Sequence, residues 1–443
     1  MAPSPSPLTV RTVAIPEGDP RHAAELLELL PDRAPLSWVR GGEGLVGWGC
    51  AARLDTSGPE RFAAADAWWH AWCEGVEVRD EVGLPGTGPV AFTSFGFADR
   101  PGDSVLVVPE VVVGCRDGVR WITTVGEPSP HPVRPVGGPG TVRYETGAVS
   151  AEQYRRAVVQ AVRILRSGDS APATASVNGT GADSGAVRKV VLAHDLLATT
   201  SEPLDARYLL RALAARYPGC WSFAVDGLVG ATPELLLERT GRRIRSRVLA
   251  GTTWPRPGVS ADDLATSLLG SAKDLSEHAF AAESLAAELR PFCGELAVPE
   301  RPEVLRLRNV LHLASHITGE LHDHAASNGV GALLRLAAAV HPSAAVGGTP
   351  TGAAVELIKR LEGMDRGRYA GPVGWVDDAG NGELGIALRC AQIEAEGASD
   401  APGGGRARLF AGGGIVAESD PDLEVAEAAA KLLPVREALD GPG

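Results

Sequence analysis

This sequence of 443 residues lacks the features of a secreted or membrane-spanning protein. Its six cysteines are scattered without a CxxC pair, which argues against zinc-type spacing and against a disulfide framework. No apolar run approaches transmembrane length, and the N-terminal stretch MAPSPSPLTV has no apolar signal-peptide segment. These absences predict a soluble, cytoplasmic protein with reduced thiols.

Basic residues are in the minority. The 42 Lys and Arg residues face 55 Asp and Glu residues, giving a net charge of −13. This balance argues against a general nucleic-acid or anionic-membrane surface. An anionic substrate would therefore need a local cationic pocket or a metal ion. No internal repeat is evident, and the length fits one large α/β or α+β unit or two domains.

The first third of the chain carries no cluster of catalytic residue types. Residues 1–8 are predicted to be a disordered tail, and residues 9–149 show mixed helical and strand patterns. We interpret 9–149 as an N-terminal α+β part that supports the rest of the same fold. Its clearest predicted elements are helices at 23–30 and 61–76 and strands at 88–97 and 104–114.

Residues 151–434 contain strand-rich blocks broken by long helices, without regular βαβ alternation. This pattern predicts an α+β fold rather than a Rossmann fold. Ser150 is a predicted N-cap for a helix over 151–166. Two polar, small-residue stretches, 167–186 and 394–407, cannot bury a core and are predicted to be mobile surface insertions. Further helices are predicted at about 204–215, 262–269, 271–290, 330–339, 352–362 and 423–432.

Chemistry-bearing residues concentrate near the end of the chain. A glycine-rich turn, AGGGI, leads into a helix on which Glu424, Glu427 and Lys431 share one face. Asp274 and Glu277 lie one turn apart on the helix predicted over 271–290. Taken separately, each acidic pair is most simply a solvated helix face, with Glu427 and Lys431 as an i,i+4 ion pair. Converging on one cleft, the pairs would instead form an all-oxygen site of the kind that suits Mg²⁺.

Several further motifs appear in a recognisable order. They are VRKVVLAH around Lys189, GATPELLLE around Glu234, HPSAAVGGTP from His341 and RGRYAGPVGW from Arg366. Together with the glycine-rich turn and its helix, they give the sequence a resemblance to the chorismate-utilising enzymes, and among them the isochorismate synthases. The resemblance runs from about residue 152 to 433. It implies two large antiparallel sheets packed face to face, helices outside, and an active site in a deep cleft.

The resemblance assigns an acid and a base. Read alone, Lys189 at a strand entrance and Glu234 after a proline are most simply exposed surface residues. The family instead implies that Lys189, as a neutral amine in a cleft, is the general base that activates water. Glu234 would be the general acid that protonates the departing hydroxyl, helped by a raised pKa. His194 stands where the family usually has arginine.

The resemblance also implies the binding residues. Glu277 and Glu427 would bind Mg²⁺ over the ring carboxylate, with Asp274 and Glu424 acting through water. Arg389, in the predicted strand GIALRCA, would hold the enolpyruvyl carboxylate. The other implied contacts are Tyr369 beside Arg389, Lys431 at the ring carboxylate, Gly251, Thr252, Ala345 and Gly412 as a cradle, and His312 at the departing hydroxyl. For His312 and His341, a satisfied structural histidine is the simpler reading. His316 and Ser315 replace a proline and a threonine of the family.

The nucleophile follows from two positions. Ala250 stands where the aminodeoxychorismate synthases carry a nucleophilic lysine, and Lys189 is present where anthranilate synthases lack a lysine. We therefore expect a Mg²⁺-dependent, reversible isochorismate synthase that adds water at C2 as the C4 hydroxyl departs.

Two alternatives share this pattern. A salicylate synthase carries the same lysine and glutamates and then eliminates pyruvate. A non-catalytic chorismate-binding protein would need neither Lys189 nor Glu234. For the enzyme we expect chorismate as the small-molecule substrate, a monomer and no glutaminase subunit. The product could serve menaquinone or siderophore biosynthesis.

Overall fold

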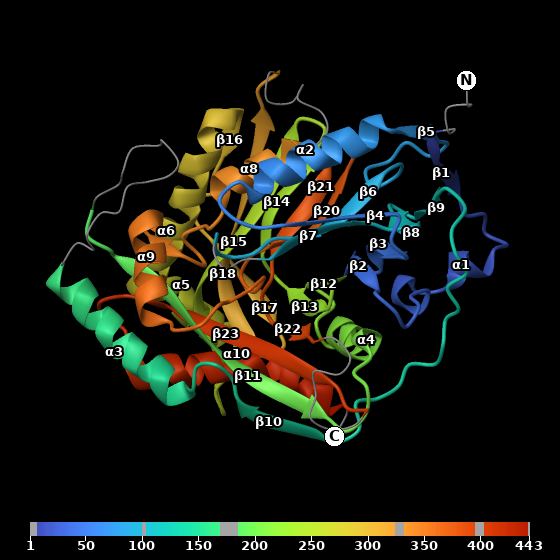
Figure 1. Ribbon diagram of the computed structural model, residues 1–443. Helices are drawn as coiled ribbons and strands as arrows, with labels where there is room; N and C mark the ends of the chain where they lie inside the picture. Colours follow the sequence, from blue (N-terminus) through green and yellow to red (C-terminus); the bar gives the residue numbers. More distant parts are fainter. Residues whose placement is uncertain (1–6, 100–102, 169–184, 324–331, 395–402, 442–443) are drawn as a thin grey trace.

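The computed structural model describes residues 7–99, 103–168, 185–323, 332–394 and 403–441. Its strands form two large sheets, one with 13 strands and one with 10. Figure 1 shows the sheets in the interior of the molecule and most helices on the outside. The predicted α+β fold with two large, mainly antiparallel sheets is confirmed. Among the described residues, no helix is long and apolar enough to cross a membrane.

The larger sheet joins strands from both ends of the chain. Its order is β10 (Val142–Thr146), β11 (Lys189–Thr200), β23 (Arg406–Ile415), β22 (Cys390–Ile393), β13 (Leu228–Thr232), β12 (Trp221–Val225), β2 (Leu36–Arg40), β3 (Glu43–Trp48), β8 (Val111–Arg116), β9 (Val119–Val125), β1 (Leu8–Ala14) and β5 (Val76–Asp80), with β19 (Gly348–Thr349) beside β11. Its β12–β2 pairing connects the later strands to the earlier ones.

The second sheet is built in the same way. Its order is β16 (Cys293–Ala297), β18 (Val310–Leu321), β15 (Arg243–Thr253), β14 (Leu235–Thr240), β21 (Gly382–Ile386), β20 (Pro372–Asp377), β6 (Val90–Ser94), β7 (Ser104–Val108) and β4 (Ala52–Thr56), with β17 (Glu303–Leu307) beside β18. Here β20 pairs with β6, so strands before residue 149 extend both sheets.

The helices follow the predicted pattern closely. The α-helices are α1 (Pro20–Ala23), α2 (Arg61–Glu74), α3 (Ala151–Ser167), α4 (Ala206–Arg216), α5 (Ala261–Gly270), α6 (Ala272–Leu289), α8 (Ala332–Val340), α9 (Thr351–Leu361) and α10 (Pro421–Asp440). Ser150 caps α3 as predicted, because its hydroxyl accepts a hydrogen bond from the Gln153 amide. Helix α10 continues past residue 432, and its last turns bury Val435, Ala438 and Leu439.

Four predictions about local structure are wrong. Residues 23–30 form no continuous helix, because Ala24 and Glu25 are extended between α1 and a short 3₁₀ turn. The strand predicted over 104–114 is two strands in different sheets, β7 and β8, separated at Pro109. Leu8 was predicted to belong to the disordered tail, but it is the first residue of β1 and pairs with Val76 of β5. The fourth, the strand position of Arg389, is described with the site.

The remaining predictions of disorder concern positions 1–6, 169–184 and 395–402, which lie outside the described residues. The predicted insertion at 394–407 is flanked by an antiparallel pair of strands, β22 and β23, in which Ile393 pairs with Ala407. Residues 167 and 168 close the C-terminal end of α3.

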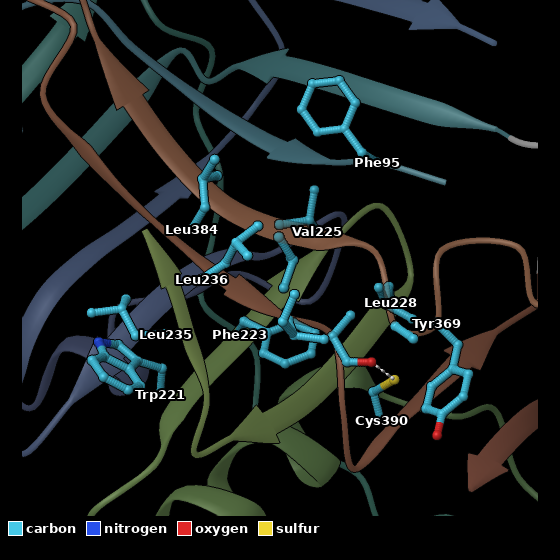
Figure 2. Packing of buried hydrophobic residues seen from close by; sticks show 14 of the residues in the cluster. Phe95, Trp221, Phe223, Val225, Leu228, Leu235, Leu236, Tyr369, Leu384 and Cys390 are labelled. Carbon is cyan, nitrogen blue, oxygen red and sulfur yellow. Dashed lines mark hydrogen bonds between the residues drawn. The ribbon is translucent and has the colours of Figure 1, made fainter. Parts of the chain in front are cut away.

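One apolar core connects both sheets. Figure 2 shows Trp221 and Phe223 of β12 in the same cluster as Leu235 and Leu236 of β14 and Leu384 of β21. Tyr369 lies at the edge of this cluster. Because β12 belongs to the larger sheet while β14 and β21 belong to the other, burial of these side chains holds the two sheets together.

Candidate active site

All of the site residues named from the sequence line one cleft. The cleft is bounded by β11 and β23 of the larger sheet, by β15 of the other sheet, and by α6 and α10. These elements are far apart in the chain and meet only in the folded protein. The residues named earlier that line it are Lys189, Glu234, Gly251, Thr252, Asp274, Glu277, His312, Ala345, Tyr369, Arg389, Gly412, Glu424, Glu427 and Lys431.

Lys189 opens β11 and is buried, with 7% of its surface exposed. Its Nζ lies 2.9 Å from Glu277 Oε1 on α6, so Lys189 and Glu277 form an ion pair at the wall of the cleft. Gly414 on the neighbouring strand β23 leaves room for this pair, because a Cβ there would lie 2.7 Å from Lys189 Cε and 3.0 Å from Glu277 Oε1. The glycine-rich segment is the end of strand β23 rather than the predicted turn, and its glycines serve the packing of the site.

Glu234 lies in the two-residue connection between β13 and β14. Its amide donates a hydrogen bond to Thr232 Oγ1 at 3.2 Å, and its carbonyl accepts one from the Ile386 amide, which fixes the backbone. Burial raises the pKa of Glu234 to about 7, against the opposing charges of Lys189, Arg247 and Lys431. A carboxyl with this pKa can give or take a proton near neutral pH.

Three carboxylates line the cleft beside the glycines of β23, without converging on one point. A Cβ on Gly413 would lie 3.0 Å from Glu424 Oε2 and 3.9 Å from Glu427 Oε1, and Glu277 reaches the adjacent glycine. Burial, followed by the charge of Glu427, raises the pKa of Glu424 to about 7. Burial alone would raise the pKa of Glu277, but the charge and hydrogen bond of Lys189 outweigh it and lower that pKa. The donor set is therefore entirely oxygen.

This donor set fits Mg²⁺ better than a metal that needs a complete protein cage. In the described part of the chain, no three His, Cys, Asp or Glu side chains converge as a metal-binding group. Mg²⁺ takes only one or two carboxylates and completes its shell with water and substrate oxygens. Asp274 lies at the start of α6, where its carboxylate accepts a hydrogen bond from the Ser271 hydroxyl. Glu427 pairs with Lys431 at 2.7 Å, as predicted.

Arg389 does not lie within a strand. It occupies the connection between β21 and β22 with φ +48°, a left-handed conformation that is rare for a side chain of this size. The turn directs the guanidinium into the cleft, where Nη1 is buried without a hydrogen-bond partner. Nη2 lies 2.8 Å from His312 Nε2. A buried guanidinium with a free N–H donor is suited to bind a carboxylate.

His312 lies on β18. Because a guanidinium can only donate, His312 Nε2 accepts from Arg389, and Nδ1 then carries the proton and faces Thr252 Oγ1 at 3.1 Å. Burial, together with the charges of Arg389 and Lys431, holds the pKa of His312 well below its ordinary value. The neutral ring therefore links Arg389 to Thr252 in the free protein.

The remaining cleft residues shape its walls. Gly251 has φ +77° at a bulge in β15, opposite Asp274. Gly412 contacts β11 so closely that a Cβ would lie 2.2 Å from the Leu192 carbonyl oxygen, and its own carbonyl accepts a hydrogen bond from Lys431 Nζ at 2.9 Å. Tyr369 stacks on Phe410 with ring centroids 5.1 Å apart.

The structure explains some departures from the family pattern. His316 points outward on β18 and pairs with Glu303, away from the cleft. The histidine that stands here in place of the family's proline therefore contacts no cleft residue. Ser315 instead holds His278 Nε2 at 2.8 Å. His194 lies beside the ring of Tyr154, and nothing in the structure explains the loss of arginine there. His341 contacts the Phe97 carbonyl outside the cleft.

One supporting pair was missed by the sequence reading. Arg366 and Glu362 form a buried ion pair at 2.6 Å. Arg366 Nη2 donates to the Val191 carbonyl, and Glu362 accepts from the Ala193 amide, so the pair clamps β11 just after Lys189. The i,i+4 spacing of opposite charges was the available signal, but it is equally common on solvated surfaces.

The cleft holds as many acidic as basic side chains. Its cations are Lys189, Lys273, Arg366, Arg389 and Lys431, and its acids are Glu234, Asp274, Glu277, Glu424 and Glu427. Lys189, Arg366 and Lys431 are each paired with a carboxylate, whereas Arg389 keeps a buried Nη1 without a partner. An unpartnered guanidinium, a carboxyl whose pKa is raised to about 7 and a buried lysine suit proton transfer on a small anionic ligand.

Comparisons with known proteins show the family and the fold. A family model described as chorismate binding enzyme matches residues 7–440. The isochorismate synthase DhbC of Bacillus subtilis is 42% identical over 268 residues, which is 58% of this chain and 64% of that protein. The match thus spans slightly less than two thirds of that relative. The salicylate biosynthesis isochorismate synthase of Pseudomonas aeruginosa is 30% identical, with 96% of this chain and 90% of that protein covered.

Solved structures share the fold. A Bacillus anthracis structure described as a 2,3-dihydroxybenzoate-specific isochorismate synthase, DhbC, has a TM-score of 0.73 at 30% identity, covering 94% of this chain and 98% of that one. Anthranilate synthase component I from Streptococcus pneumoniae has a TM-score of 0.64 at 18% identity, covering 90% and 92%. The second likeness concerns the fold alone.

Proposed function

Because this chain belongs to the chorismate-binding enzymes, whose isochorismate synthases are isomerases, we propose that it converts chorismate reversibly to isochorismate. The observation that carries the proposal is the placement of Lys189 and Glu234 in one cleft, both buried, with Glu234 titrating near neutral pH. Binding alone requires neither a buried amine nor a carboxyl tuned in this way.

In the proposed reaction, water supplies the incoming oxygen. Lys189, in its neutral amine form, takes a proton from water as a bond forms between the water oxygen and ring C2. The double-bond electrons shift around the ring, the bond from C4 to its hydroxyl breaks, and Glu234 gives that oxygen a proton. One water enters and one leaves, so the step is balanced and close to thermoneutral. In reverse, Glu234 is the base and Lys189 the acid.

The cationic groups would hold the two carboxylates. Arg389 has an unpartnered Nη1 for the enolpyruvyl carboxylate, and Tyr369 lines the cleft with it. Lys431 lines the same cleft and would bind the ring carboxylate. His312 and Thr252 would support Arg389 and the departing hydroxyl through their hydrogen bonds.

Mg²⁺ is the cofactor that we propose for this site. Glu277 and Glu427 would hold it, with Glu424 and Asp274 acting behind them through water. When bound there, the ion would offset the charge of the ring carboxylate. Because water is the nucleophile, no glutaminase subunit is needed, and we expect the enzyme to act in the cytoplasm.

The test is to incubate the purified protein with chorismate and Mg²⁺ and to separate the products. Isochorismate in equilibrium with chorismate is the expected result. Salicylate with stoichiometric pyruvate would identify a salicylate synthase. Binding of chorismate without turnover would identify a non-catalytic binding protein and would contradict the proposal.

A further inference from the structure

Arg247, on β15, is a buried cation without an anionic partner. Only 4% of its surface is exposed, and its Nε and Nη2 atoms are buried without hydrogen-bond partners. Within the described ranges, no carboxylate lies within ion-pair distance of it. Buried charged side chains are normally paired, since an unpaired one is costly to remove from water. Such a residue therefore calls for an explanation.

The guanidinium is held in place by an aromatic ring. Its central carbon lies 4.5 Å from the ring centroid of Trp221 on β12, and that of Arg40 lies 4.4 Å from the same ring. Trp221 lies at one edge of the apolar cluster in Figure 2. Its Nε1 donates to Glu383 Oε2 at 3.0 Å, which fixes the ring. Cation–π contact thus takes the place of an ion pair for Arg247.

Arg247 lies close to Glu234 in the fold. Arg247 pairs with Leu235, the residue after Glu234, across the β14–β15 ladder. The Ser246 hydroxyl donates to the Leu235 carbonyl at 3.0 Å and ties the two strands together at this point. Glu234 and Arg247 also line one small internal cavity, which is separate from the main cleft.

Arg247 differs from the other cations that act on Glu234. Lys189 on β11, Lys431 on α10 and Arg389 in the β21–β22 connection all line the substrate cleft, whereas Arg247 does not. In the proposed reaction, the substrate carboxylates engage Arg389 and Lys431. Arg247 does not line that cleft, so its charge acts on Glu234 whether or not substrate is bound. Glu303 is the other carboxylate whose charge acts on Arg247.

We propose that Arg247 is a positioning residue for Glu234: fixed against Trp221 and free of any carboxylate, its charge keeps the Glu234 carboxyl able both to give and to take a proton. The role of Glu234 in this inference rests on the proposed function. Burial raises the pKa of Glu234, and the charge of Arg247 is among those that oppose this rise. Without that charge, the carboxyl would stay protonated to higher pH, so the pH range of a reversible reaction would move upward.

The test is a titration of Glu234 itself. Protein labelled with ¹³C at glutamate carboxyls is titrated by NMR without substrate, and the Glu234 signal is assigned by its loss in Glu234→Gln. Arg247→Met removes the charge and keeps an apolar stem, and Arg247→Gln is a second neutral variant in case the first fails to fold. Arg247→Lys keeps the charge. Arg40→Gln is the matched control, because Arg40 is exposed and contacts the same ring.

We expect the Glu234 midpoint to rise by about one pH unit in the neutral variants and to stay near that of the parent protein in Arg247→Lys and Arg40→Gln. The pH profile of kcat/KM with chorismate should move in the same direction. A merely structural role would lower activity without moving either midpoint. A Glu234 titration that is unchanged in both neutral variants overturns the inference. Absence of turnover in the parent protein would overturn the proposed function, while the NMR titration would still decide this one.

Discussion

Glu234 shows how strongly one residue depends on its surroundings. In the sequence it is a glutamate after a proline, most simply an exposed one. In the folded protein it is buried, and its pKa rises to about 7. Burial favours the protonated form, and the surrounding cations prevent that form from dominating at every pH. The residue scale is therefore where the proposed chemistry can be tested most sharply.

Lys189→Ala and Glu234→Gln should each lower isochorismate formation by roughly two to four orders of magnitude, the usual contribution of a positioned acid or base. Chorismate binding should survive, because Arg389 and Lys431 are unchanged. Steady-state kinetics in both directions and a binding isotherm provide the check. Both directions should fall by the same factor, since the equilibrium is unaffected. Near-normal turnover in Lys189→Ala would show that another group activates water.

Glu234→Gln should also change how stability depends on pH. The folded-state pKa of about 7 lies above the ordinary 4.5, so this group contributes stability that is fully present below the ordinary value and is lost as pH rises through 7. The loss is at most about 3 kcal/mol for a shift of this size. Denaturant unfolding at pH 5 and pH 8 should show a smaller pH-dependent loss in the variant. An identical loss in both proteins would mean that Glu234 is not buried as a titrating acid.

The residue types of the site were predictable from sequence, but their environments were not. Motif order placed Lys189, Glu234 and Arg389, whereas the left-handed turn at Arg389 depends on how β21 leaves its sheet. Arg247 gave no signal, because an arginine two residues from Arg245 on a strand looks like part of a solvated face. Its burial is caused by Trp221, which comes from the other sheet.

Among the elements, two helices and one strand form the part of the cleft that carries the carboxylates. Helix α6 supplies Glu277, α10 supplies Glu427, and β23 supplies the glycines between them. Helix periodicity predicted which acids share a face. It could not show that the two faces converge, because that depends on the β11–β23 pairing. Alternation could not have located β18, because its first half is buried on both faces and lacks the pattern of a half-buried strand.

Turnover should require a divalent cation, with Mg²⁺ the most effective, because both helices direct carboxylates at one cleft. Glu277→Gln and Glu427→Gln should abolish activity without unfolding the protein. The melting temperature of Glu427→Gln should stay close to that of the parent protein, whereas Glu277→Gln should melt at a lower temperature, because it leaves the buried Lys189 without its ion-pair partner. Activity assays with EDTA and with metal added back, alongside thermal melts, are the measurements. Glu356→Gln, on the exposed face of α9, serves as the control. Full turnover in excess EDTA would exclude a role for the metal.

At the scale of the whole molecule, the two halves of the chain share both sheets. Strand β2 covers the edge of β12, and β6 covers the edge of β20. The chain also crosses from one sheet to the other at Pro109, between β7 and β8. The fold class was predictable from the element pattern. The interleaving was not, because strand pairings between distant segments leave no periodicity in the sequence.

A fragment of residues 150–443 should therefore not fold alone. Removing the first part would expose the edges of β12 and β20 and the apolar core that β2 and β6 help to cover. Circular dichroism and thermal melting of the fragment should show no cooperative transition. A cooperative melt with retained chorismate binding would show that residues 151–434 form an independent domain.

The origin of the C2 hydroxyl oxygen tests most directly whether the enzyme adds water to chorismate. The protein is incubated with chorismate and Mg²⁺ in H₂¹⁸O, and the isochorismate formed is analysed by mass spectrometry with fragmentation that locates the label. Addition of water activated by Lys189, with departure of the C4 hydroxyl protonated by Glu234, predicts one ¹⁸O at the C2 hydroxyl. Isochorismate with an unlabelled C2 oxygen would mean that the hydroxyl moves from C4 without exchange with water. That result would contradict the addition of water at C2.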